Sequence, residues 1–184
     1  MSLARNLARL FPNASGLLPN ANIEAMAASK LTGQVPDANA PSGSVIQVVQ
    51  GSTTTIVSTT AYQTYVDTGL SATITPLLAS SKILVIANQH YWQNSSVATT
   101  IFGHIRVLRD STPIFVPSVS ENVFGSSMAE IGYRQSMSIV DSPNTTSSIT
   151  YKTQGYITAP PTGAQLTINR NNAIATIILM EIAA

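Results

Sequence analysis

The sequence contains only two histidines, His90 and His104, and no cysteine. These histidines lie on different predicted strands, and neither belongs to a His-x-His or His-Glu-x-x-His pattern. Zinc and similar ions are bound by clustered His, Cys and carboxylate ligands, so the spacing predicts no metal site within one chain and no cofactor. A threefold axis could still gather three copies of one histidine around an ion, and the sequence leaves that alternative open.

Groups for covalent or acid–base catalysis are also sparse. Serine is abundant, yet no Gly-x-Ser-x-Gly elbow occurs, and the lack of cysteine removes thiol nucleophiles. Glycoside cleavage needs two facing carboxylates roughly 5–10 Å apart. The available acids are scattered along the chain: Asp67, Asp110, Glu121, Glu130, Asp141 and Glu181. Three of them, Asp67, Asp110 and Asp141, fall in predicted turns. We therefore expect no catalytic residues and a protein that is not an enzyme.

One short segment has the residue types of a carbohydrate contact. Tyr91, Trp92 and Asn94 end a strongly apolar predicted strand, and Trp92 is the only tryptophan. Aromatic rings stack on sugar faces and amides bond to hydroxyls, so these three residues are candidates for contact with a receptor glycan. The alternative is that Trp92 packs in the core or at a seam between subunits. The long predicted loop Pro117–Ile131 is a second candidate surface.

The charge pattern excludes several classes of partner. Nine basic and eight acidic residues give a formal charge of +1, without a basic run, so nucleic acid is not an expected partner. No segment approaches the roughly 18 uninterrupted apolar residues of a membrane span, so no membrane insertion is expected. The absence of cysteine fits synthesis in a reducing compartment.

Residues that could bind a ligand must be positioned by strands, because β-branched and small polar residues dominate the chain after residue 41. Turn signals separate short β-rich runs without intervening helices, which predicts an all-β antiparallel sandwich or jelly roll. The predicted strands are Val45–Gln50, Thr54–Thr60, Ser71–Thr75, Lys82–Tyr91, Thr99–Leu108, Pro113–Val116, Tyr133–Val140, Ser148–Thr158, Gln165–Arg170 and Ala173–Ile182.

The composition changes near Pro41–Gly43, which predicts an extended, short-helical N-terminal arm over residues 1–41 and a β-sandwich domain over 42–184. The arm begins with an apolar stripe at helical spacing, formed by Leu3, Leu7, Leu10 and Phe11. A helix this short is not stable alone in water, so we interpret the stripe as an anchor on another protein. A frayed terminus and a membrane-surface helix are the alternatives.

The arm also contains an internal repeat. Gly16–Asn22 returns as Gly33–Asn39, with Gly, an aliphatic residue, Pro, an Asx residue, Ala and Asn in the same order. Between the copies, Ile23, Met26 and Leu31 lie on one face of a short predicted helix. Because that stripe has no core of its own, we predict that it packs against the same stripe in other copies and trimerises the chain.

Two predicted strand segments, Ile83–Ala87 and Ile174–Met180, are apolar on both faces. A strand of this kind is normally covered on both sides, whereas an antiparallel sandwich covers only one. Another subunit would cover the second face. A homotrimer is the preferred assembly, although periodicity does not separate two copies from three.

Several segments resemble proteins of bacteriophage tails. Lys30–Asn39 resembles the "LTG…P…AN" segments of tail-fibre stalks. Gly43–Gln50 with Ser80–Val85, Ser142–Lys152 and Met180–Ala184 are similar to a C-terminal β domain of virion fibre proteins, particularly of aquatic phages. The resemblance covers most of residues 41–184 and the stalk-like arm.

That resemblance implies a trimeric tail fibre in the virion, made in the bacterial cytoplasm, with an N-terminal attachment region and a distal β domain. It implies other virion proteins of the tail, baseplate or capsid as partners, and a host-surface glycan as a further one. The alternatives are a capsid decoration or cement protein, a neck or baseplate protein, and a carbohydrate-binding module outside any virus.

Overall fold

The computed structural model describes residues 40–95, 101–117, 123–124, 130–158 and 163–184. The chain divides into two units, Met1–Pro36 and Asp37–Ala184, and the described residues all belong to the second. The residues predicted for attachment and trimerisation lie outside the described residues: Leu3, Leu7, Leu10, Phe11, Ile23, Met26 and Leu31. Their roles, and the boundary near residue 41, therefore stay predictions.

The described residues form an all-β fold, which confirms the predicted fold class. In the described part of the chain, no helix is long and apolar enough to cross a bilayer. The strands are β1 (Val45–Thr53), β2 (Val57–Thr59), β3 (Val66–Ile74), β4 (Lys82–Ser95), β5 (Ile101–Arg109), β6 (Thr112–Phe115), β7 (Val123–Phe124), β8 (Glu130–Asp141), β9 (Ile149–Ile157), β10 (Ala164–Ile168) and β11 (Ala175–Ile182), with a 3₁₀ turn at Arg170–Asn172.

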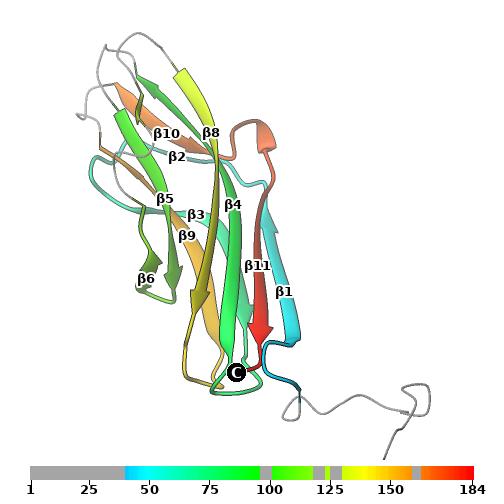
Figure 1. The fold of residues 1–184 in the computed structure, drawn as a ribbon. Helices are drawn as coiled ribbons and strands as arrows, with labels where there is room; N and C mark the ends of the chain where they lie inside the picture. Colours follow the sequence, from blue (N-terminus) through cyan, green and yellow to red (C-terminus); the bar gives the residue numbers. More distant parts are fainter. Residues whose placement is uncertain (1–39, 96–100, 118–122, 125–129, 159–162) are drawn as a thin grey trace, which may run out of the picture. The chain divides into compact units, whose positions relative to one another are not determined.

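Two antiparallel sheets make up the sandwich (Figure 1). In the first sheet, β4 is central: β8 pairs with one side of it along nearly its whole length. On the other side, β11 pairs with the first half of β4 and β10 with the second half. The outer neighbours are β1 beside β11 and β2 beside β10. The second sheet has the order β3-β9-β5-β6, with β7 also beside β5.

Each predicted strand overlaps a strand of the structure, but several ends differ. β8 begins at Glu130, before the predicted Tyr133, and ends at Asp141, which was predicted to lie in a turn. The prediction that Asp67–Gly69 forms a turn was wrong, because these residues lie within β3. They form a bulge there: the pairing of β3 with β9 shifts between Asp67 and Ser71, and Gly69 adopts a φ of 81°. A bulge and a turn both favour glycine at positive φ, which is why the sequence signal was ambiguous. The two-residue strand β7 was not predicted.

The core lies between the sheets and is built from alternate residues of the strands. In β4 the odd-numbered residues from Ile83 to Ser95 are buried and the even-numbered ones are not. The largest fully buried side chains are Leu70, Ile74, Ile83, Tyr91, Ile101, Ile105, Tyr151, Ile157, Leu166, Ile168 and Ile177.

A chain of buried hydrogen bonds crosses this core. The Thr153 hydroxyl, which also bonds to the hydroxyl of Thr68, donates to Gln89 Oε1 over 3.1 Å. The Gln89 amide nitrogen donates to Asn169 Oδ1 over 2.7 Å, and Asn169 Nδ2 donates to the carbonyl of Thr55. Because each amide is paired, the chain joins the second sheet to β4 and to the turn after β10 without an unsatisfied group at Gln89.

Two further side chains replace missing backbone partners. Gln135 of β8 accepts a hydrogen bond from the amide of Ile105 and donates one to its carbonyl. Its side chain therefore takes the place of a pairing strand beside β5, between β6 and β7. The fully buried Glu181 accepts bonds from the amides of Leu77 and Leu78 at 2.8–3.1 Å. Both contacts satisfy backbone groups that strand pairing leaves open.

Replacing Gln89 tests the buried chain. Gln89→Ala removes the acceptor of the Thr153 hydroxyl and the donor to Asn169 Oδ1, and we expect a loss of about 2–4 kcal/mol in unfolding free energy. The measurement is urea unfolding at a fixed protein concentration, followed by the fluorescence of the single tryptophan. The matched control Gln50→Ala, at an exposed site on β1, should cost no more than about 0.5 kcal/mol. Equal losses in both variants would show that the buried chain contributes no particular stability.

Candidate functional site

The even-numbered residues of β4 face away from the core, and together with β8, β11, β10 and β1 they form the outer face of the first sheet. One row across this face is entirely apolar. Val140 pairs with Leu84, Leu84 with Met180 and Met180 with Val48, so the four side chains lie side by side on four strands. We call these four residues the apolar row. Val48 is 58% exposed and Val140 54%.

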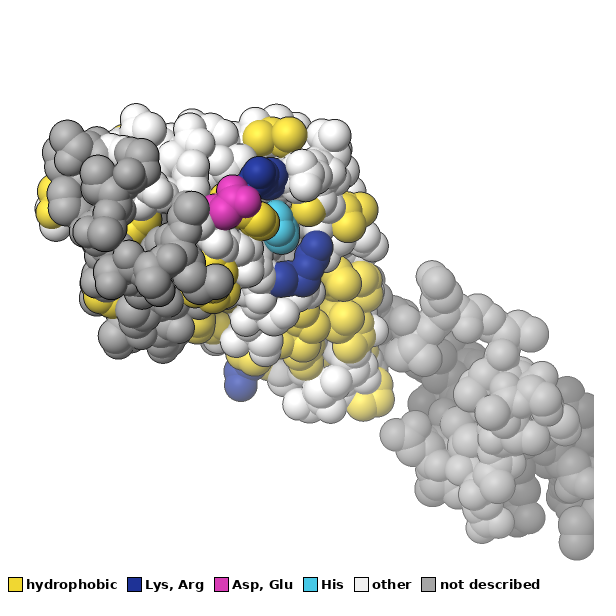
Figure 2. All heavy atoms as spheres, turned by 90° about the horizontal axis from the view of Figure 1, so that it is seen from above, with side chains coloured by type: hydrophobic (Ala, Val, Ile, Leu, Met, Phe, Trp, Pro, Cys, Tyr) yellow, Lys and Arg dark blue, Asp and Glu magenta, His cyan; other side chains and the backbone are white. Residues whose placement is uncertain are grey.

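The neighbouring positions extend the row. Ile86 pairs with Ile178 on one side of it, and Ile182 pairs with Val45, which is 53% exposed, on the other. Figure 2 looks from above onto the opposite end of the sandwich and shows a histidine there among acidic, basic and hydrophobic side chains. The sequence prediction that strands β4 and β11 carry apolar residues on both faces therefore matches the structure, while the subunit predicted to cover the second face stays a prediction.

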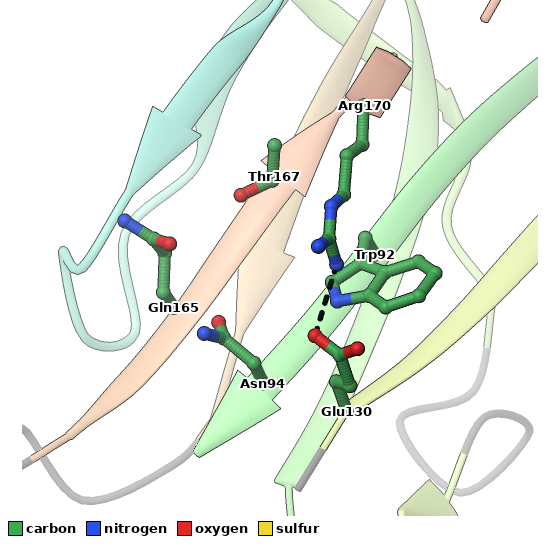
Figure 3. Close-up of a pocket in the computed structure, with 6 residues that line it drawn as sticks. All are labelled: Trp92, Asn94, Glu130, Gln165, Thr167 and Arg170. Carbon is green, nitrogen blue, oxygen red and sulfur yellow. Dashed lines mark hydrogen bonds and ion pairs between the residues drawn. The ribbon is translucent and has the colours of Figure 1, made fainter. Parts of the chain in front are cut away.

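Polar residues occupy the other end of the same face. Trp92, Asn94, Glu130, Gln165, Thr167 and Arg170 surround a cavity of about 200 Å³, and we call it the Trp92 pocket (Figure 3). β4 supplies the first two residues, β8 the third, β10 the next two and the turn after β10 the last. Strand pairing brings them together, because Asn94 lies opposite both Glu130 and Gln165, and Trp92 lies opposite Thr167.

The indole ring of Trp92 packs against a glycine and against a cation. The partner of Trp92 on β8 is Gly132, where an added Cβ would lie 2.7 Å from the indole ring. The guanidinium carbon of Arg170 lies 3.9 Å from the ring centroid, within cation–π range. Arg170 also forms an ion pair with Glu130 over 3.0 Å, with 38% and 50% of the two side chains exposed. An ion pair this exposed holds its partners weakly.

Two polar atoms of the pocket have no hydrogen-bond partner among the described residues. They are the indole Nε1 of Trp92, which is a donor, and Oδ1 of Asn94, which is an acceptor, and both are shielded from solvent. Buried polar atoms are normally satisfied, so an unpartnered donor and acceptor in one pocket is a feature that needs a chemical explanation.

The structure separates the three residues predicted to contact a glycan. Trp92 and Asn94 line the pocket, whereas Tyr91 points into the core and its hydroxyl donates to the carbonyl of Gly103. Burial raises the pKa of Tyr91, consistent with this role in the core. The sequence prediction missed Gln165, Thr167 and Arg170. Only strand register could have found them, because they lie far from Trp92 along the chain. Glu130 belongs to the predicted loop Pro117–Ile131, but in the structure it is the first residue of β8, and most of that loop lies outside the described residues.

The two histidines lie in different environments. His104 is buried on β5, where its Nε2 lies 3.0 Å from the Tyr65 hydroxyl and its ring stacks on Tyr156. His90 lies on the outer face of β4, opposite Arg134. Burial lowers the pKa of His90 below its usual 6.5, and the positive charge of Arg134 lowers it further. Within the described ranges, no three His or acidic residues are arranged to hold a metal ion.

Most of the acids that could do chemistry have structural partners. Asp141 is paired with Arg109 at 2.8 Å and accepts a hydrogen bond from Tyr151. Asp110 accepts from the amide of Thr150. Burial raises the pKa of Asp67, but hydrogen bonds from Gln154 and Lys152 outweigh it and the net shift is downward.

Glu121 lies outside the described residues, and Glu181 is buried against the backbone. Among the residues that the structure describes, Glu130 is thus the only carboxylate lining the Trp92 pocket. A two-carboxylate glycosidase arrangement is not formed by the described residues around it.

Comparison with known proteins adds likenesses of fold only. No protein-family model matches the chain, and no curated protein sequence matches it either. Among solved structures, it is similar to the VP2 subviral particle of infectious bursal disease virus, with 16% identity and a TM-score of 0.42. It is also similar to the structure of the Gx strain of that virus, with 15% identity and a TM-score of 0.39.

Each match covers 84% of this chain but only 42% and 41% of the viral chains, so this chain spans about two fifths of their length. At these identities and TM-scores, the likeness assigns neither a family nor a function. Neither structure is a bacteriophage fibre, and the resemblance to phage tail fibres stays a prediction from the sequence.

The pKa of His90 offers a test of the electrostatics beside the pocket. Arg134→Gln should raise this pKa, because it removes a like charge, but leave it below 6.5, because burial remains. NMR titration of the two histidines measures the shift. Lys82→Gln removes an equal charge about 27 Å along β4 and should leave His90 unchanged.

The same shift affects stability. The folded pKa of His90 is depressed, so as pH falls below 6.5 the unfolded chain gains a proton that the folded chain resists, and stability falls. Arg134→Gln should reduce that fall. If the His90 titration is the same in Arg134→Gln as in the native chain, the guanidinium is not a cause of the shift.

Proposed function

We propose that this protein is a non-enzymatic structural component of a virion, whose copies associate through the outer face of the first sheet. In the specific form of the proposal, it is a homotrimeric phage tail fibre. Residues 1–41 anchor it to other virion proteins, and the β-sandwich is exposed for attachment to the host. The sequence resemblance supports the virion assignment, and the apolar row supports the association.

The apolar row is the observation that carries the proposal. A sandwich buries one face of each sheet, and the outer face of an antiparallel sheet is ordinarily polar. Here four neighbouring strands present Val140, Leu84, Met180 and Val48 in register, flanked by further isoleucines and Val45. Contiguous apolar surface of this kind marks an interaction site.

A second copy of the same chain is the occupant that fits this surface. With only 9% charged residues, the chain carries little of the charge that keeps separate subunits apart in solution. The four residues of the row are uncharged, so three copies can turn their rows toward one axis without burying an ion at those positions. Lys82 lies on the same face, where it pairs with Ile182 and is exposed. Three copies whose rows face one threefold axis form a closed assembly, and closed symmetry is usual for homo-oligomers.

Charged substitutions in the row test the proposal. In the full chain, Val48→Glu with Val140→Glu would bury two carboxylates per copy in an apolar contact, and we expect association to weaken on the order of a hundredfold. The measurement is sedimentation and light-scattering mass over a concentration series. Val116→Glu is the matched control, because Val116 is 52% exposed but lies beyond β6, outside the first sheet.

The native chain and Val116→Glu should both have the mass of three copies over the same concentration range. A native chain that is monomeric throughout would overturn self-association and favour a decoration protein held by its capsid partner. A double variant that associates as tightly as the control would show that the row is not the contact, and would leave the predicted arm helix as the trimerisation element.

A further inference from the structure

We propose that the Trp92 pocket binds a neutral sugar unit, and that the Arg170–Glu130 ion pair covers the site when it is empty. The inference deepens the host-attachment part of the proposed function and rests on it. The site lies at the far end of the outer face from the apolar row, about 27 Å along β4. A contact between copies at the row therefore leaves the pocket accessible.

The pocket has the polarity that a hydroxyl-rich ligand requires. Its lining offers the amides of Asn94 and Gln165, the hydroxyl of Thr167 and the indole N–H of Trp92 (Figure 3). These groups include donors and acceptors in similar number, as do the hydroxyls of a sugar ring. The cavity of about 200 Å³ is smaller than the roughly 300–1,000 Å³ of sites for drug-sized ligands, so it fits a single small unit.

The unpartnered atoms identify where such a unit would bind. Sugar hydroxyls can both accept a hydrogen bond, as Trp92 Nε1 requires, and donate one, as Asn94 Oδ1 requires. A ligand that supplied only acceptors, or only donors, would leave one of the two atoms unsatisfied. The pair of atoms thus favours a hydroxyl over a carboxylate or an ammonium group.

Trp92 Nε1 and Asn94 Oδ1 are shielded from solvent, so the Arg170–Glu130 pair must move before a ligand can reach them. Arg170 is the group stacked on the Trp92 ring, and Glu130 is its ion-pair partner. Both side chains are substantially exposed, and an exposed ion pair is easily opened. When Arg170 swings away, the indole face becomes free for the apolar side of a sugar ring.

The charges of the pocket argue against an anionic ligand. Among the described lining residues, Arg170 is the only cation, and Glu130 already neutralises it. A sugar acid would have to compete with Glu130 for the guanidinium while lying close to that carboxylate. Like charges in one small site repel, so a neutral sugar is the better fit.

The test uses the full chain and a fixed panel of probes. The neutral probes are methyl glucoside, methyl galactoside and N-acetylglucosamine, and the acidic probes are glucuronic acid and N-acetylneuraminic acid. Trp92 is the only tryptophan, so its emission reports on the pocket directly. Saturation-transfer NMR gives an independent reading of the bound sugar.

We expect at least one neutral probe to shift the emission and to show saturation transfer. Asn94→Ala and Gln165→Ala should each weaken that binding by about tenfold, because each removes hydrogen bonds to the sugar. The matched control Gln50→Ala, on the outer edge of the same sheet, should not change it. Glu130→Gln should tighten binding by up to about fivefold, because it loosens the cover.

Three outcomes would overturn the inference. The first is no signal from any probe, and the second is binding that Asn94→Ala and Gln165→Ala leave unchanged. The third is binding of the acidic probes alone that Arg170→Ala abolishes, which would make the pocket an anion site. Sedimentation of the same samples separates these failures from a failure of the proposed function, because association depends on the apolar row and not on the pocket.

Discussion

The alternation of side chains along β4 is the constraint on which the rest of the structure depends. β4 is fourteen residues long and pairs with β8, β10 and β11, so its register sets the faces of three neighbouring strands. Odd-numbered residues build the core, and even-numbered residues build both the apolar row and the Trp92 pocket. A slip of one residue would move Tyr91 to the surface and Trp92 into the core, and both surfaces would be lost together.

Polar contacts fix this register where apolar packing alone would tolerate a shift. Gln89 is one of the inward-facing residues of β4. Its amide forms both of its hydrogen bonds only when Thr153 and Asn169 lie beside it, as they do in this register. Gln135 fixes β8 against β5 in the same way. Such contacts discriminate between registers because a displaced amide would be buried without partners. The outcome is one sheet face with two different ends: an apolar end suited to contact between copies, and a polar end suited to a small ligand.

Much of the fold was predictable, because β-branched runs and turn residues act locally. The apolar residues on both faces of β4 and β11 also identified the surface that forms the apolar row. The sequence wrongly predicted a turn at Asp67–Gly69, because a bulge and a turn require the same glycine conformation. The pocket was only half predictable: Trp92 and Asn94 are close in sequence, but Glu130 reaches them through the pairing of β8 with β4, and Arg170 through the turn after β10. Tyr91 and Trp92 are adjacent, so composition alone could not tell which of them faces outward.

The most direct measurement is whether the outer face of the first sheet touches another copy of the chain. The protein has no cysteine, so Val140→Cys gives each chain a single spin label, and dipolar coupling between labels reports only contacts between copies. We predict short label-to-label distances at Val140 and markedly longer ones for the control Thr73→Cys, on the exposed side of β3. Distances at Val140 that are as long as those at Thr73, or an absence of coupling at Val140, would contradict association through this face.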